Sequence, residues 1–335
     1  MGADIVRRIA DAVLYEGYLL WPYRKSALKN QQRFTFGGVY PPAWEDSSLM
    51  QAQVLLRDDE DAEVEVRVRF LQMVERQVLK DGPSSVTSQP VEELEVDGRR
   101  WVSWDEAVER EIAPGPIQIE EGDRLERIPG GAIRRSWRAL EGEVSFACEL
   151  VRRGLWRITV RVTNTTPWVA ALREDAPWRP VGERDVPPQS NTRKDALCQT
   201  FCSTHAVLRV RRGEWVSLTD PPDELRADAE ACENIGVWPV LVGEEGDMST
   251  MLASPIILSD HPEIAPESPG DLFDSGEIDQ MLVLNILAMT DEERRDMRDS
   301  DPRAREILER TEALSDEQIM RLNGVVREFG LVRGR

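Results

Sequence analysis

The sequence is poor in the residues on which catalysis and disulfide bonding most often depend. Its 335 residues include only two histidines and four cysteines. Four cysteines in so long a chain indicate free thiols rather than a disulfide framework. Any Ser-His-Asp or Cys-His catalytic system would have to use His205 or His261, because the chain has no other imidazole.

Several segments that would assign a compartment or a reaction are also missing. No apolar run reaches the roughly 18 residues that a membrane helix needs. The N-terminus lacks the apolar core and the small-residue cleavage site of a signal peptide. Neither a G-x-S-x-G elbow nor a GxxxxGKS/T nucleotide loop is present. We therefore expect a cytoplasmic protein, and we expect it not to be an enzyme of these motif families.

The charge of the chain is strongly negative. Acidic residues number 62 against 42 basic ones, which gives a formal net charge of -20. Such an excess repels phosphate backbones and anionic lipids, so neither nucleic acid nor a membrane surface is an expected partner. Blocks of acidic residues most often form a solvated face rather than a binding site.

What the sequence does have is concentrated in two stretches of opposite character. Residues 15–42 hold all four tyrosines of the chain, together with two of its lysines and Arg24 and Arg33. Residues 227–293 contain no lysine or arginine and sixteen acidic residues. Attraction between the first stretch and the acidic residues 260–277 predicts that the two pack together within one molecule.

Hydrophobic periodicity predicts an α+β fold, with an antiparallel β-sandwich or barrel-like body and a helical C-terminal region. Apolar residues alternate with charges over 63–78, and again over 158–163, as in half-buried strands. Turn residues predict hairpins at 153–154 and 212–213. We read residues 80–100 as polar and turn-rich, 4–14 and 223–234 as short helices, and 237–241 and 251–258 as buried apolar runs.

Capping signals place helices in the last 60 residues. Asp274 with Glu277, Thr290 with Glu293 and Ser315 with Gln318 each have the spacing of a capping box. Pro302 fits the first turn of a further helix. We divide the chain into a β-rich body, residues 1–260, and a second part, residues 261–335, with an extended acidic motif and helices.

Two groups of residues resemble metal ligands. Cys198, Cys202 and His205 lie close in sequence, but their spacing matches no standard zinc motif, and buried structural cysteine is the better interpretation. His261 lies between Asp260 and Glu263, with Glu267 and Asp271 downstream, a set that suits magnesium, manganese or iron. The alternative is that Asp260 caps a turn and His261 makes one structural hydrogen bond. We predict no metal, no cofactor and no catalytic residue.

The residues that we expect to matter form a protein-recognition surface. Tyrosine, tryptophan and arginine dominate protein–protein hot spots, and the first stretch supplies all three types. The predicted binding residues are Tyr18, Trp21, Tyr23, Arg24, Lys29, Asn30, Gln31 and Arg33, together with His261, Glu263, Glu267 and Asp271.

The strings YEGYLLWPYRKSALKNQQRFTFGGVYP and SPIILSDHPEIAPESPGDLFDSGEID resemble an uncharacterised actinobacterial family. That family is associated with the gene neighbourhoods of high-affinity nickel–iron hydrogenases. The resemblance implies an accessory protein that helps to assemble, mature or protect the hydrogenase or its iron–sulfur partner. It carries no catalytic residue over, and the paired CxxC motifs of the hydrogenase large subunit are absent.

The sequence therefore favours a non-enzymatic accessory or scaffold protein whose partner is a hydrogenase subunit. Two alternatives stay open. One is a metal-assisted hydrolase that uses His261 and the nearby carboxylates. The other is a structural homo-oligomer with a large apolar symmetric interface.

Overall fold

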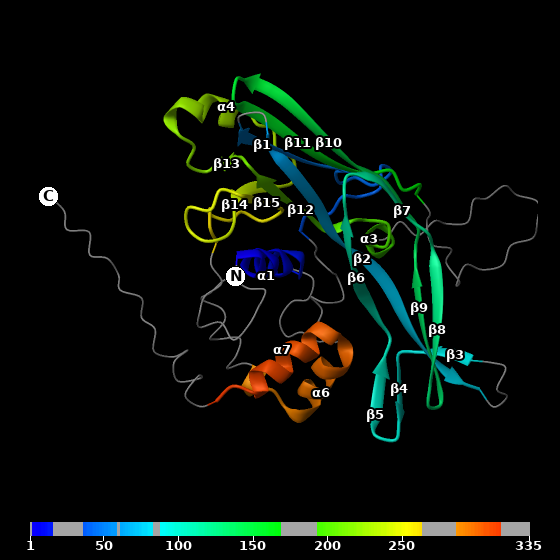
Figure 1. The fold of residues 1–335 in the computed structure, drawn as a ribbon. Coiled ribbons are helices and arrows are strands. Elements are labelled where there is room, and N and C mark those ends of the chain that lie inside the picture. The colour runs from blue at the N-terminus through cyan, green and yellow to red at the C-terminus, as the bar shows by residue number, and fades with distance from the viewer. Residues whose placement is uncertain are drawn as a thin grey trace, which may run out of the picture.

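The structure of the chain is a computed structural model that describes residues 2–15, 36–58, 61–82, 88–168, 193–262 and 286–315. Fifteen strands dominate these ranges (Figure 1). The strands are β1 Leu49–Arg57, β2 Glu63–Asp81, β3 Ser88–Val91, β4 Glu93–Val96, β5 Arg99–Val102, β6 Trp104–Ile112, β7 Gly115–Ile119, β8 Gly122–Ile128, β9 Gly131–Trp137, β10 Leu140–Arg152, β11 Leu155–Asn164, β12 Cys202–Arg211, β13 Glu214–Val216, β14 Trp238–Leu241 and β15 Thr250–Ser254. The helices are α1 Gly2–Tyr15, α3 Arg193–Leu197, the 3-10 turn η1 Asp223–Leu225, α4 Arg226–Glu230, α6 Asp291–Ser300 and α7 Pro302–Glu312.

Two antiparallel sheets stack to form the body. The smaller sheet has five strands in the order β13-β1-β11-β10-β7. The larger sheet has eight strands, with β14-β15-β12-β2-β9-β8 as its main path and with β3 and β6 also paired to β2. A separate hairpin joins β4 to β5. This arrangement confirms the predicted α+β class, with an antiparallel sandwich as its body.

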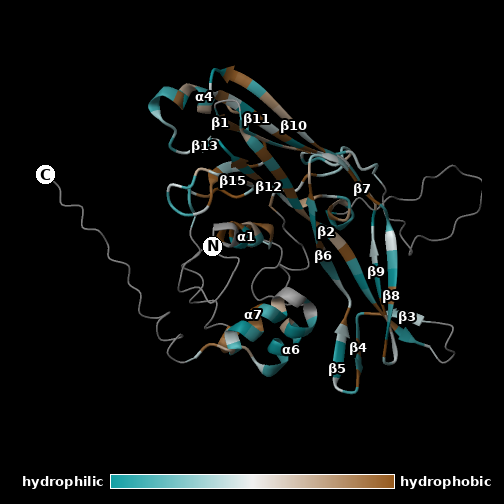
Figure 2. Cartoon of the chain, viewed as in Figure 1, coloured by the Kyte–Doolittle hydropathy of each residue, from teal (hydrophilic) through white to brown (hydrophobic). Residues whose placement is uncertain are grey.

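The main hydrophobic core lies between the two sheets. Alternate residues of β1, β2, β11 and β12 point into it. The positions between them are mostly polar or charged, as the banding in Figure 2 indicates. Buried side chains from both sheets fill the space: Met50, Val54, Val68, Phe70, Val144, Ile158, Val160, Leu208 and Trp215. The period of two in the sequence is therefore the direct cause of the two-layer body.

Strand β2 is the backbone of the larger sheet. Its 19 residues pair with β12 along 63–71, with β6 along 68–76, with β9 along 75–80 and with β3 along 78–81. Where two partners overlap along β2 they must occupy opposite edges of it. One edge therefore carries β12 and then β9, and the other carries β6 and then β3.

Helices cover the outer faces of the sheets. The first helix, α1, packs on β12 and β15, while α4 lies over β1. Near the C-terminus, α6 and α7 share a second apolar cluster with β2 through Leu71 and Met73. The Thr290 side chain accepts from the Glu293 backbone, and Glu293 accepts from the Thr290 backbone, which confirms the predicted capping box.

Several local predictions are confirmed. The predicted strand from residue 63 is β2, the turn at Arg153-Gly154 joins β10 to β11, and α7 begins at Pro302. All four cysteines are free thiols. Three predictions involve residues outside the described ranges. These are the capping pair Asp274 with Glu277, the capping pair Ser315 with Gln318, and the domain boundary near residue 260.

Other local predictions are wrong. The strands around Arg212-Gly213 exist, but they do not form a hairpin, because β13 pairs with β1 in the other sheet. The crossing places Trp215 in the core between the sheets. Residues 80–100, read as turn-rich, contribute β3, β4 and part of β5. The helix expected over 223–234 is shorter, ending at Glu230.

In the part of the chain that the structure describes, no helix is both long enough and apolar enough to cross a bilayer.

The position of Phe70 allows a test of this core. Phe70 is fully buried on β2 and its ring centroid lies 4.7 Å from that of Phe201. We expect Phe70→Ala to lower the free energy of unfolding by about 3–5 kcal/mol, because it removes buried apolar surface and leaves a cavity. Urea denaturation followed by circular dichroism measures the change. The control is Leu125→Ala, since Leu125 is 55% exposed on β8. A loss equal to that of the control would contradict the position of Phe70 in the core.

Candidate functional site

The face of β2 and β12 that points away from the core carries a row of charged side chains. The register places four residue pairs directly opposite one another: Arg69 with His205, Arg67 with Val207, Glu65 with Arg209 and Glu63 with Arg211. Opposite residues in an antiparallel pair point to the same side of the sheet. The neighbouring residues Val66, Val68 and Leu208 lie in the core. The alternation of valine with charge therefore gathers four arginines on one outer face.

The N-terminal helix covers part of this face. Val6, Ile9, Ala10 and Val13 of α1 are spaced so that they share one side of the helix. They form a buried cluster with four apolar residues of the sheet. These are Val207 of β12, Val240 of β14, Val242 just after β14, and Leu252 of β15. The helix is held by this apolar contact and brings Asp11 and Tyr15 over the charged row.

Arg69 is itself buried and is the centre of an ion-pair network beneath α1 whose carboxylates are partly exposed. Its guanidinium lies 2.6 Å from Asp11 of the helix, 3.4 Å from Glu109 and 3.9 Å from Glu111 of β6. The Tyr15 hydroxyl donates to Glu109 at 2.7 Å. Removal of one partner from such a network leaves buried charge uncompensated, which is strongly destabilising. The network therefore fixes α1 to the sheet.

His205 lies beside Arg69, where β12 contains a bulge. Between Cys202 and His205 the register shifts by one residue, and Ser203 adopts a positive φ of 54°. The Ser203 hydroxyl donates to the Val13 carbonyl of α1 at 3.1 Å. A bulge adds one residue to a strand and re-aims the side chains that follow it. Here it links the strand to the helix, and the His205 imidazole lies buried on the outer face of the sheet beside Arg69.

The imidazole of His205 is fully buried and neutral. Its Nδ1–H donates to the Ser203 carbonyl at 3.0 Å, while Nε2 has no hydrogen-bond partner among the described residues. Burial lowers the pKa of His205 to about 4, and the positive charge of Arg69 adds to the lowering, against the opposing effects of the Ser203 hydrogen bond and Glu109. His205 therefore acts as a structural group and is not positioned as a solvent-accessible base.

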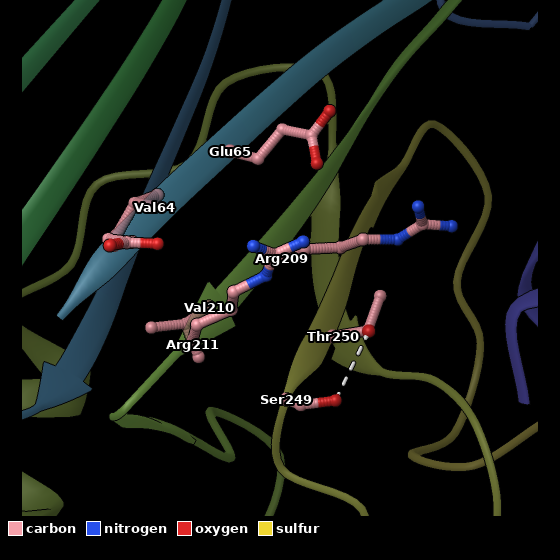
Figure 3. A pocket seen from close by; sticks show the side chains of 8 residues that line it. Val64, Glu65, Arg209, Val210, Arg211, Ser249 and Thr250 are labelled. Atoms are coloured by element: carbon pink, nitrogen blue, oxygen red, sulfur yellow. Dashed lines mark hydrogen bonds between the residues drawn. The ribbon is translucent and has the colours of Figure 1, made fainter.

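Two hollows open on this charged face. One, of about 290 Å³, lies beside α1 and is lined by Arg7, Arg67, Arg69 and Arg209 among others. The other, of about 430 Å³, is lined by the facing ends of β2 and β12 and by Ser249 and Thr250 (Figure 3). The two hollows share Glu65 and Arg209. We call the five arginines around them the arginine face: Arg7, Arg67, Arg69, Arg209 and Arg211.

The members of the arginine face differ in how their charge is compensated. Arg67 pairs with Glu65 at 2.9 Å, and Arg69 is held in its network. The side chains of Arg209 and Arg211, by contrast, are exposed and have no hydrogen bond or ion pair within the described ranges. Residues two apart on a strand are separated by about 7 Å. The two guanidinium groups are thus free to bind a carboxylate or phosphate group through bidentate hydrogen bonds.

The arginines of the two hollows offer chemistry for binding an oxyanion. The residues that line the two hollows include the hydroxyls of Ser249 and Thr250 but no histidine and no cysteine. His205 lies on the same strand and lines neither hollow. The carboxylates of Glu63 and Glu65 line the same hollow as Ser249 and Thr250, and these two hydroxyls can serve as additional hydrogen-bond partners for a bound oxyanion.

Most of the predicted recognition residues lie outside the described ranges. These are Tyr18, Trp21, Tyr23, Arg24, Lys29, Asn30, Gln31 and Arg33 of the first stretch, and Glu263, Glu267 and Asp271 of the second. Their predicted contact with one another stays a prediction.

His261 is the one predicted binding residue that the structure describes. It has a positive φ of 51°, and its backbone N–H donates to the Leu241 carbonyl at 2.7 Å. The neighbouring Asp260 carboxylate accepts from the Leu241 backbone at 2.8 Å and from the Ser217 hydroxyl at 2.5 Å. This geometry fits the structural interpretation of the pair. The ring Nδ1 of His261 is buried without a partner among the described residues. This nitrogen is therefore available to bind a ligand.

The cysteine–histidine group does not come together as ligands. Cys202 is fully buried, and burial raises the pKa of the Cys198 thiol to about 12. Across the described residues no three histidine, cysteine or acidic side chains are placed to hold a metal ion. The interpretation of Cys202 as a buried structural residue is confirmed.

Sequence reasoning missed the arginine face. The signal was present as charged residues alternating with apolar ones in the runs VEVRVR, residues 64–69, and LRVR, residues 208–211. Each run alone predicts an ordinary solvated strand face, and only the pairing of β2 with β12 shows that the arginines are neighbours.

The depressed pKa of His205 predicts a pH dependence of stability. The unfolded chain takes up a proton at this histidine near pH 6.5, whereas the folded protein does so only near pH 4. The stabilisation is present above pH 6.5 and is lost as the pH falls toward 4. We expect a loss of about 2 kcal/mol in the free energy of unfolding between pH 7.5 and pH 5 from this group.

Urea denaturation across this pH range, with His205→Asn beside the wild type, measures the contribution. His261→Asn replaces the only other histidine and is the matched control. The same variant assigns the two imidazole signals in an NMR titration, where the His205 signal should not move above pH 5. Titration of His205 near pH 6.5 in the folded protein would contradict its burial.

Comparison of the chain with protein-family models, with curated proteins and with solved structures gives no match. The function is therefore inferred from the residues of the chain itself.

Proposed function

We propose that the chain is a non-enzymatic accessory protein that binds an acidic segment of another protein at the arginine face. The observation that carries the proposal is the pair Arg209 and Arg211, whose side chains are exposed and make no hydrogen bond or ion pair within the described ranges, in a protein of net charge -20. In such a protein most arginines are expected to be neutralised by the surplus of carboxylates. Two that are left unpaired side by side are suited to an external anion.

The surroundings of the two arginines favour a macromolecular partner. The hollows lie along a sheet face rather than in an enclosed pocket, and their linings mix charged and apolar side chains. Nucleic acid is disfavoured as that partner, because the net charge of the whole chain repels a phosphate backbone. A protein segment with a few carboxylates matches the local charge without the long-range repulsion of a polyanion.

The resemblance of the two sequence strings to the hydrogenase-associated family suggests which partner to test first. We propose that the partner is a subunit of a nickel–iron hydrogenase, which the chain helps to assemble or mature. The aromatic and basic residues 15–42, with Trp21 and Arg24 among them, would extend the recognition surface. Arginine and aromatic side chains are the residue types that contribute most to such interfaces.

A second candidate function is a metal-assisted hydrolase with His261 as a ligand. The buried ring nitrogen of His261, which has no partner among the described residues, supports it. The placement of the described side chains weighs against it, because no three histidine, cysteine or acidic side chains among them are placed to hold a metal ion.

The test is a binding measurement with purified hydrogenase subunits of the native host. The variant Arg209→Glu/Arg211→Glu reverses the two uncompensated charges. The matched control Arg124→Glu/Arg153→Glu changes the net charge equally at exposed arginines of β8 and of the β10–β11 turn. We expect the first variant to raise the dissociation constant at least about tenfold, because hydrogen bonds to charged groups contribute 1.5–3 kcal/mol each, and the control to leave it within about twofold. Isothermal titration calorimetry measures both.

Two outcomes would overturn this proposal. Equal binding by the two double variants would remove the arginine face from recognition. Absence of binding, together with stoichiometric metal in the purified protein that disappears in His261→Ala, would make the hydrolase the function to pursue. Trp21→Ala and Arg24→Ala, compared with the wild type in the same assay, test the predicted contribution of residues 15–42.

A further inference from the structure

In the described part of the chain, most open strand edges are protected against pairing with another chain. Edge strands expose unpaired backbone groups, and proteins shield them with short length, proline or charge. Most open edges among the described residues have such a device: three residues only in β13, Pro239 in β14, Pro90 in β3, Pro116 in β7, and closely spaced charges in β6, in β8 and in the first residues of β2. The exception is the second half of β10.

The unprotected segment of β10 is a short slot with a defined start and end. On one side β10 pairs with β11, while on the other β7 pairs only with residues 140–144. A bulge between Leu150 and Arg152 ends the regular strand. Residues 145–150 therefore have no strand on the side opposite β11 within the described part of the chain. The slot is long enough for a strand of five or six residues.

The hydrogen bonds of the neighbouring ladder show which backbone groups face the slot. Thr165 N–H donates to the Glu141 carbonyl at 2.9 Å, so Glu141 is turned toward the β11 side. Because this orientation alternates along an antiparallel strand, residues 145, 147 and 149 also face β11. Pro116 of β7 is opposite Glu143. Glu143 belongs to the set that faces β11, so the β7 residue opposite it donates no hydrogen bond to β10, and a proline without an N–H fits there. The N–H and C=O groups of Phe146, Cys148 and Leu150 therefore point into the open slot.

The side chains along the slot are apolar and exposed. Phe146 is 37% and Leu150 is 55% exposed, and Cys148 between them is also exposed. They are opposite Val160, Ile158 and Trp156 of β11, so they lie on the side of the sheet that faces the core. Figure 2 shows this end of β10 as a hydrophobic band beside α4. An added strand would cover the open rim of the core.

We propose that this slot is filled by β10 of a second copy of the chain, paired antiparallel about a two-fold axis at Cys148. In this register Phe146 of each copy is opposite Leu150 of the other, and Cys148 is opposite Cys148. Each of these pairs exchanges two backbone hydrogen bonds, about six in all. The two five-stranded sheets then continue into one another.

Three features of the slot favour a second copy as its occupant. The symmetric register puts an aromatic residue against a leucine, a favourable cross-strand pair. It places Glu149 opposite Ala147 and no like charges face each other, while residues 145–152 carry one acid and one base and are locally neutral. The bulge ends the incoming strand after Leu150, before it would meet the start of β7 opposite Val144.

The association is tested with the full chain in reducing buffer by sedimentation equilibrium. We expect the wild type to be a dimer. Cys148→Pro removes an N–H that faces the slot and leaves the β11 ladder intact, so this variant should be a folded monomer. Cys148→Ala keeps the N–H and should remain a dimer. Leu150→Lys should raise the dimer dissociation constant at least about tenfold, whereas Leu125→Lys, at an equally exposed leucine, should not.

The register is tested by mild oxidation with copper phenanthroline. Opposite residues in a hydrogen-bonded pair have Cα atoms about 5.5 Å apart, within the range of a disulfide bond. Mass spectrometry of a tryptic digest should then show the peptide Ala139–Arg152 linked to itself through Cys148. Circular dichroism spectra that match the wild type confirm that each variant is folded.

Several results would overturn the proposal. A wild-type chain that stays monomeric at high concentration would exclude the second copy. A dimer that persists in folded Cys148→Pro would place the interface elsewhere. Dimerisation lost in Cys148→Ala under the same reducing conditions would indicate that the Cys148 side chain, and not backbone pairing, holds the two copies together. Capture of a different protein by a monomeric wild type, lost in Leu150→Lys, would assign the slot to that protein. None of these results depends on hydrogenase binding, so the two proposals fail separately.

Discussion

The pairing of β2 with four different strands is the constraint on which the rest of the molecule depends. Its first half joins β12 and so forms the sandwich, and its second half joins β6, β9 and β3 and extends the larger sheet beyond the smaller one. Side chains along a strand point alternately to the two faces of the sheet. The register of β2 against its partners therefore fixes which of its side chains enter the core and which face outward. A slip by one residue would exchange Phe70 with Arg69 and destroy both the core and the ion-pair network.

The outer face shows how a sheet can anchor a helix and still expose charge. Apolar side chains of α1 bury Val207 and Leu252, while Asp11 and Tyr15 reach the network around Arg69. The bulge at Ser203 adds a hydrogen bond to the helix backbone. The His205 side chain that follows the bulge is fully buried. Toward the other end of β12 the helix no longer covers the strand. Arg209 and Arg211 are left exposed there, next to hydroxyls that can assist in binding an oxyanion.

The two surfaces proposed for interaction would bind their partners through different physical forces. The arginine face would rely on charge, so its affinity should weaken as salt screens the attraction. The β10 slot would rely on backbone hydrogen bonds and apolar contact, and salt should affect it little. Two copies of a chain of net charge -20 repel each other overall, so a locally neutral slot favours their contact. The two surfaces lie on different sheets, so occupation of one does not require the other.

Short-range signals in the sequence determined the elements themselves. The alternation in residues 63–70, the turn at Arg153-Gly154 and the capping pair Thr290 and Glu293 each act within a few residues, and the structure contains all three features. The tertiary structure decided what those elements join. A strand pattern is the same whichever partner it meets, so the sequence of 206–218 predicted a hairpin although β13 pairs with β1. For the same reason neither the row of arginines across β2 and β12 nor the open edge of β10 was visible until residues far apart in the chain were paired.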